Sequence, residues 1–207
     1  YNLLEILTHI RHNEKVLNMK RLLFILILTF NFQILTKADD IRDFEIEGMS
    51  IGDSLLDYFS EKEIKNKKKL ILIGGKSFND YNKIFKEHDN KMYDRVVLYF
   101  KSNDTKYIIR TIAGRNYYTS NINECYDLQM DISNQIENTL NNTKKDIRKK
   151  SKNNSFPNGD SYKNEILFYL KDKSFISIVC YDYSKKDTNS RDRLPVQITT
   201  HEYNSWL

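Results

Sequence analysis

The longest periodic pattern of apolar side chains falls in the middle of the chain. From about Asn121 to Lys149, apolar residues recur at steps of three and four positions, the spacing of one face of an α-helix. The members of this stripe are Cys125, Leu128, Ile132, Ile136 and Leu140. The pattern therefore predicts a long amphipathic helix. Ser77–His88 has similar spacing and predicts a second helix, with apolar positions at Phe78, Tyr81, Ile84 and Phe85.

Two pairs of apolar runs predict β-hairpins. Arg95–Lys101 and Lys106–Ile112 flank the polar turn 102–105, and Glu165–Leu170 and Ser174–Tyr183 flank the turn 171–173. Runs rich in β-branched and aromatic residues on both sides of a short polar turn are typical of antiparallel hairpins. Further strands are predicted at Asp43–Ile51, Leu70–Ile73, Asn116–Thr119 and Leu194–Thr200, with Gly114 allowing a bend before the third of these.

The predicted fold class is α+β, with an antiparallel sheet built from hairpins and the long amphipathic helix packed on one face. The segment 39–207 is expected to form a single domain. Both halves of this domain show a helix followed by a hairpin, but they share too few identical residues to establish an internal duplication.

The segment Met19–Ala38 has the three parts of a secretory signal peptide. A positive start at Lys20 and Arg21 precedes the apolar stretch Leu22–Leu35, and the small residues Thr36 and Ala38 occupy the −3 and −1 positions before Asp39. The stretch is shorter than the roughly 20 apolar residues that span a bilayer. We therefore expect export to the periplasm or the medium, with an uncleaved membrane anchor as the alternative. Residues 1–18 do not fit this plan and are interpreted as an upstream extension.

The charge of the chain gives little reason to expect nucleic-acid binding. The formal net charge is +5, from 33 basic and 28 acidic side chains. The first 38 residues contain five of the basic and two of the acidic groups, so the mature domain is left with about +2. A nearly balanced domain lacks the broad positive field that attracts phosphate backbones. A nucleic-acid partner is therefore not predicted.

The two cysteines, Cys125 and Cys180, both lie in the mature domain. In an oxidising compartment, an even number of cysteines favours a disulfide. Two buried free thiols are the alternative. Two cysteines without a spaced histidine pair provide too few ligands for a zinc site, so neither a metal nor a cofactor is predicted.

The string Gly52-Asp53-Ser54-Leu55 resembles the nucleophile block of the GDSL hydrolase family. The resemblance implies an ester hydrolase with Ser54 as the nucleophile, at the end of a first parallel strand, and His201 as the base. The family's Asp-x-x-His is incomplete because position 198 is Ile. A glycine turn followed by a helix N-cap explains the same residues without chemistry.

A basic run marks the end of the predicted long helix. Its members are Lys144, Lys145, Arg148, Lys149, Lys150 and Lys152. Such a run can bind an anionic surface. It is also what the negative end of a helix dipole favours, which makes a solvated helix end the simpler interpretation.

The run from Phe44 to Phe59 is similar to the opening of a group of small, uncharacterised exported proteins of AT-rich marine alphaproteobacteria. The later segments Tyr107–Gly114 and Asn121–Cys125 are also similar to that group. The resemblance implies a leader-bearing, single-domain product and no known activity. Together with the absence of a complete catalytic set, it favours an exported binding or interaction domain of the cell envelope, without catalytic activity. An ester hydrolase using Ser54 is the alternative.

Overall fold

The computed structural model describes residues 40–73, 76–87, 92–118, 121–140, 143–153, 160–184, 186 and 190–207 of the chain. The chain divides into two compact units, Tyr1–Thr36 and Lys37–Leu207, and all the described residues belong to the second. The expected leader, Met19–Ala38, and the extension before it lie outside the described residues. They remain predictions.

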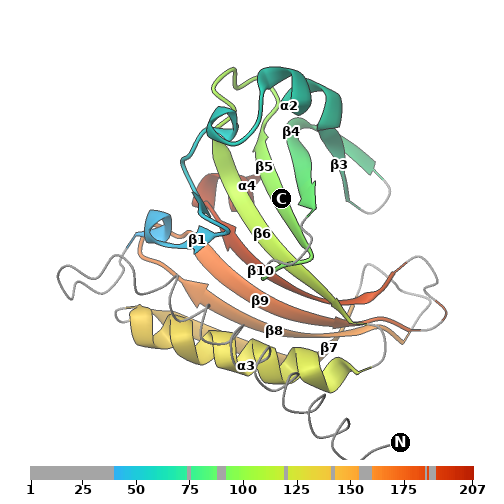
Figure 1. Ribbon diagram of the computed structural model, residues 1–207. Coiled ribbons are helices and arrows are strands. Elements are labelled where there is room, and N and C mark those ends of the chain that lie inside the picture. The colour runs from blue at the N-terminus through green and yellow to red at the C-terminus, as the bar shows by residue number, and fades with distance from the viewer. Residues whose placement is uncertain are drawn as a thin grey trace, which may run out of the picture. The chain divides into compact units, whose positions relative to one another are not determined.

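The second unit is built around an eight-stranded sheet with the order β3-β4-β5-β6-β10-β9-β8-β7 (Figure 1). All its described neighbouring strands pair antiparallel. The strands are β3 (Lys69–Ile73), β4 (Lys76–Glu87), β5 (Arg95–Lys101), β6 (Ile109–Tyr118), β7 (Lys144–Lys152), β8 (Tyr162–Tyr169), β9 (Phe175–Asp182) and β10 (Asp192–Thr199). The α+β class is therefore confirmed. Each half of the sheet contains four strands that are consecutive in the chain, and the halves join where β6 pairs with β10.

The remaining elements are short, with one exception. They are η1 (Ile41–Asp43), β1 (Glu45–Ile46), β2 (Met49–Ser50), η2 (Leu55–Asp57), α2 (Glu61–Lys67), α3 (Ile122–Thr139) and α4 (His201–Trp206). Strands β1 and β2 form their own two-stranded sheet, so the strand expected over Asp43–Ile51 is in fact a small hairpin. Helix α2 begins with a full capping box between Ser60 and Glu63. Among the described residues, no helix is long and apolar enough to cross a membrane.

Both expected hairpins are confirmed, as β5–β6 and β8–β9. Strand β6 is longer than expected because it continues through Gly114, where a bend was predicted. A Cβ atom at Gly114 would lie 2.6 Å from the ring of Tyr93, which is only 3% exposed. The backbone N–H groups of Met92 and Tyr93 donate to the Glu47 carboxylate, which fixes this ring in place. The glycine therefore makes room for a packed ring within a continuous strand.

The helix predicted over Ser77–His88 is wrong, because the described part of that segment belongs to β4. A spacing of three and four positions divides side chains between the two faces of a strand. Thus Tyr81 and Phe85 lie on one face of β4 and Ile84 lies on the other. Both faces offer burial, since β4 lies between β3 and β5, and its pairing with them overrides the helical spacing.

The long helix is also shorter than predicted. Helix α3 ends at Thr139, and the basic run from Lys144 forms strand β7 instead of the last turns of a helix. The apolar stripe of the helix ends at Leu140, so a longer helix would have had nothing further to bury. Pairing with β8 gives the polar segment backbone partners along its length.

Two contacts join α3 to the strands beside it. Cys125 forms a disulfide with Cys180 of β9, which confirms the predicted pairing. The Gln129 amide donates to the carbonyl oxygens of Asn164 and Ile178, at 2.9 and 2.8 Å. These bonds provide partners for a buried polar side chain that would otherwise weaken the helix stripe.

Candidate functional site

The two residues expected from the hydrolase resemblance have local structural roles. Ser54 caps η2: its hydroxyl accepts from the Leu56 N–H and donates to the Lys106 carbonyl at 2.7 Å. The ring of His201 lies 3.2 Å from the hydroxyl of Ser205, one turn further along α4. Among the described residues, no hydrogen bond joins Ser54 to His201. The antiparallel sheet also offers no parallel strand ending at Ser54, so the hydrolase hypothesis gains no support.

The basic run lies on β7, at one edge of the sheet. Because strand side chains alternate, its cations are divided between the two faces instead of forming a helix end. Lys145 forms an ion pair with Glu137 at 2.6 Å, and Arg148 forms one with Asp146 at 2.8 Å. The strand pairing is also irregular near Lys150, whose φ is +45°. Lysines and irregular pairing are common devices for protecting an exposed sheet edge.

A different set of cations gathers near the opposite edge of the sheet, around the ring of Phe85. We call Lys69, Lys83, Phe85, Arg95 and Arg115 the Phe85 cluster. The register places Lys69 of β3 directly opposite Lys83 of β4, and Arg95 of β5 directly opposite Arg115 of β6. Directly opposed side chains on one face of a sheet have Cβ atoms about 5 Å apart. The cluster therefore contains two like-charge pairs, which are normally destabilising.

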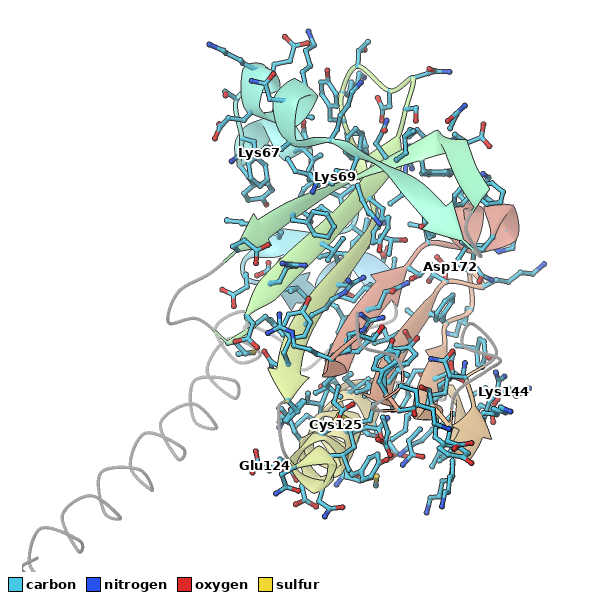
Figure 2. All side chains as sticks on the ribbon, turned by 90° about the vertical axis from the view of Figure 1, so that its right-hand side faces the viewer. Lys67, Lys69, Glu124, Cys125, Lys144 and Asp172 are labelled. Carbon is cyan, nitrogen blue, oxygen red and sulfur yellow. A yellow bond between two sulfur atoms is a disulfide. The ribbon has the colours of Figure 1, made fainter. Side chains whose placement is uncertain are left out.

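Three of these cations lie close to the same ring. The ammonium groups of Lys69 and Lys83 lie 5.4 and 5.7 Å from the Phe85 centroid, and the Arg95 guanidinium lies 5.1 Å from it. In Figure 2, Lys69 is labelled near the top of the sheet and Lys144 of β7 near the bottom. The Phe85 cluster is thus separated from the basic run by most of the width of the sheet.

Acidic side chains neutralise little of this charge. Arg95 forms an ion pair with Glu87 at 2.7 Å. Among the described residues, no carboxylate pairs with Lys69, Lys83 or Arg115. The cations beside α4 differ, since Lys101 and Arg110 both form ion pairs with Glu202.

The environment of the cluster is partly apolar. A buried group beside it, on the same face of the sheet, contains Ile71, Tyr81, Val97, Tyr99, Ala113 and Tyr203, with Phe85 and Trp206 packed against them. Burial lowers the pKa of Lys83, and the positive charges of Arg115 and Lys69 lower it further. The Nε atom of Arg115 is buried without a hydrogen-bond partner in the described part of the chain, while its Nη2 donates to the Tyr99 hydroxyl at 3.3 Å. An anion bound beside these cations would relieve their repulsion.

Sequence reasoning did not predict this cluster. Its members come from four strands, and Lys83 and Phe85 fell inside a segment with helical spacing. The useful signal was the alternation of Lys83, Phe85 and Glu87, which places these residues on one face once the segment is recognised as a strand. The pairing of Lys69 with Lys83 requires the strand register, which depends on tertiary structure.

The chemistry of the described residues otherwise offers few sites. No group of three or more His, Cys, Asp or Glu side chains among them could hold a metal ion. Comparison with known proteins finds no matching family, no matching curated protein and no matching solved structure. The similarity of Phe44–Phe59 to the exported alphaproteobacterial group therefore remains a prediction.

Proposed function

We propose that the chain is an exported, non-catalytic binding domain that holds an anionic ligand at the Phe85 cluster. The observation that carries this proposal is the pair of like-charge contacts, Lys69 with Lys83 and Arg95 with Arg115. Arg95 has an acid, Glu87, opposite it on β4, but no acid lies opposite Lys69, Lys83 or Arg115 in the described strand pairing, although a cation faced by an acid would be more stable. Retaining two repulsive pairs on one face is understandable if a ligand supplies the missing negative charge. In this proposal, α3 packs on the other face and leaves the cluster accessible.

The type of cation also supports this proposal. A guanidinium presents paired N–H donors that match the oxygen atoms of a carboxylate, sulfate or phosphate. A lysine in a partly apolar environment gains more from an anion than it would in water, because the local dielectric constant is lower. The cluster combines guanidinium and ammonium groups beside a buried aromatic core. The ligands that suit it are therefore oxyanions, such as carboxylate, sulfate or phosphate.

Export is the second part of the proposal. The Cys125–Cys180 disulfide is compatible with an oxidising compartment, and Met19–Ala38 has the pattern of a cleaved leader. Intact mass under non-reducing conditions tests this after expression from Met19. The expected product starts at Asp39 and is lighter by two hydrogen atoms than the reduced chain. An uncleaved or reduced product would contradict export.

Anion binding is tested by titration calorimetry and thermal unfolding with inorganic phosphate and sulfate. The double variant K83M/R115Q should lose binding, because it removes one member of each like-charge pair. The matched control is K149Q/K152Q on β7, which removes the same number of charges from the other edge of the sheet. The expected result is loss of binding for the first variant and normal binding for the control. Equal losses in both, or no binding by the unaltered protein, would refute the proposal.

A further inference from the structure

The residues beside the Phe85 cluster indicate what kind of anion it holds. Resting on the proposed function, we propose that the ligand is an extended acidic polysaccharide, with carboxylate or sulfate groups along its length. In this proposal the polymer runs from the Phe85 cluster across the same face of the sheet to β9. A small anion would occupy only the first part of this surface.

The second part is a group of alternating aromatic and cationic side chains that we call the tyrosine–arginine ladder. Its members are Tyr117, Tyr181, Tyr183, Arg191 and Arg193. The register places Tyr117 opposite Arg193 across β6 and β10, and Arg193 opposite Tyr181 across β10 and β9. Tyr117 also lies two residues beyond Arg115 on β6. The ladder therefore lies on the same face as the cluster and continues from it.

The cations of the two groups connect without a break. The Arg95 guanidinium lies 5.1 Å from the centroid of the Phe85 ring and 5.8 Å from that of the Tyr117 ring. It therefore connects the Phe85 cluster to the tyrosine–arginine ladder. The Arg191 guanidinium lies 4.7 Å from the centroid of the same Tyr117 ring. Arg193 lies 5.1 Å from each of two stacked rings, those of Tyr181 and Tyr183. The result is a strip of six cations in which the rings support the guanidinium groups.

The strip is too long for a single small anion. It extends from β3 to β9, which is five interstrand spacings, or roughly 24 Å at about 4.8 Å each. Glu87 is the acidic side chain that pairs with a cation of this strip among the described residues. Arg191 and Arg193, like three of the cluster cations, have no carboxylate partner in that part of the chain. Regular positive charge over such a length is complementary to a polymer with a negative charge on successive units.

The structure favours a polysaccharide over other linear polyanions. Proteins bind single-stranded nucleic acids by stacking bases on open aromatic faces. Here each ring of the ladder already has a guanidinium over it. An acidic peptide would add to a sheet through backbone hydrogen bonds at a free edge. Of the strands in the strip, only β3, which contributes Lys69, lies at an edge of the sheet, whereas β4, β5, β6, β10 and β9 have neighbours on both sides. Most of the strip therefore offers charge without a free backbone edge.

The test is a length series of acidic oligosaccharides, from one to about eight galacturonate units, measured by titration calorimetry at low salt. For the unaltered protein, affinity should rise at least tenfold from the monomer to the octamer. The ladder variant R191Q/R193Q should bind phosphate and the monomer normally but lose the gain with length. The cluster variant K83M/R115Q should lose both, and the β7 control K149Q/K152Q should behave like the unaltered protein.

Each alternative has its own result. If R191Q/R193Q binds the octamer normally, the polysaccharide proposal fails while anion binding at the Phe85 cluster still stands. If K83M/R115Q binds phosphate normally, the proposed function itself fails. Tighter binding of oligothymidylate or of polyglutamate with equal charge would overturn the choice of polymer. Equal losses in the β7 control would show non-specific charge attraction and overturn the site.

Discussion

The proposed site makes an unusual prediction about stability: removing the Lys83 charge should cost the fold little or nothing. In Lys83→Met, the apolar stem remains beside Phe85 and only the ammonium is lost. Lys83 lies opposite Lys69, and its lowered pKa shows that its charge is disfavoured by burial and by the neighbouring cations. The substitution should remove this unfavourable charge while abolishing the binding of anions. A residue that is unfavourable for stability and necessary for binding is characteristic of a functional site.

The expected size follows from the contacts. Removing a directly opposed like charge gains about 0.2–1 kcal/mol, and losing an exposed cation–π contact costs about 0.5 kcal/mol. Lys144 provides a matched control, because its ammonium lies 6.0 Å from the Tyr169 ring and the register places that tyrosine, not a cation, opposite it. Because both variants lose a cation–π contact, Lys83→Met should be more stable than Lys144→Met by about 0.2–1 kcal/mol at low salt.

Urea unfolding followed by circular dichroism measures this difference. The advantage of Lys83→Met should disappear in 1 M salt, where the screening length falls to about 3 Å. Phosphate should raise the midpoint of the unaltered protein and of Lys144→Met, but not that of Lys83→Met. The reasoning from like-charge pairs would be refuted if Lys83→Met were less stable than Lys144→Met at low salt. It would also be refuted if the stability difference between the two variants did not change with salt concentration.

Three further predictions concern the fold and the charge state of the site. Gly114→Ala should reduce stability by about 1–3 kcal/mol because its Cβ would meet the buried Tyr93 ring, and adding Tyr93→Leu should recover part of the loss in a double-mutant cycle. Cys125→Ala with Cys180→Ala should cost about 4 kcal/mol in denaturant unfolding, since the disulfide spans a sequence separation of 55; an unchanged midpoint would contradict this. Phosphate affinity should fall as pH rises through the lowered pKa of Lys83, below its usual value of 10.5. Between the lowered pKa and the usual value, the unfolded chain binds more protons than the native one, so the free energy of unfolding without ligand should rise with pH. A free energy of unfolding that falls with pH in this interval would refute the lowered pKa of Lys83.

The sequence predicted elements best where short-range signals agreed. The hairpins β5–β6 and β8–β9 follow from apolar runs around polar turns, and the N-cap at Ser54 follows from a glycine turn beside a capping residue. The disulfide was predicted from cysteine count alone. The prediction of secondary structure from the sequence was wrong at β4 and β7, where a helically spaced or polar segment acquires its conformation from neighbouring strands.

The candidate site could not be predicted in the same way. Lys69, Lys83, Arg95 and Arg115 are ordinary surface cations when read in order, and the chain contains many lysines. The consecutive run that begins at Lys144 is recognisable in the sequence, because its cations are neighbours along the chain. The structure shows that this run is divided between two faces of an edge strand, whereas the dispersed cations meet around one ring.

The sequence by itself determined the α+β class, the local hairpins, the capped turns and the presence of a cysteine pair, because each depends on residues close together in the chain. Tertiary structure alone decided the strand order, the conversion of two expected helical segments into strands, and the position of the Phe85 cluster. The physical reason is that hydrogen bonds between strands satisfy the backbone of any segment placed between partners, whatever its own periodicity. The register of those bonds then determines which charges face one another.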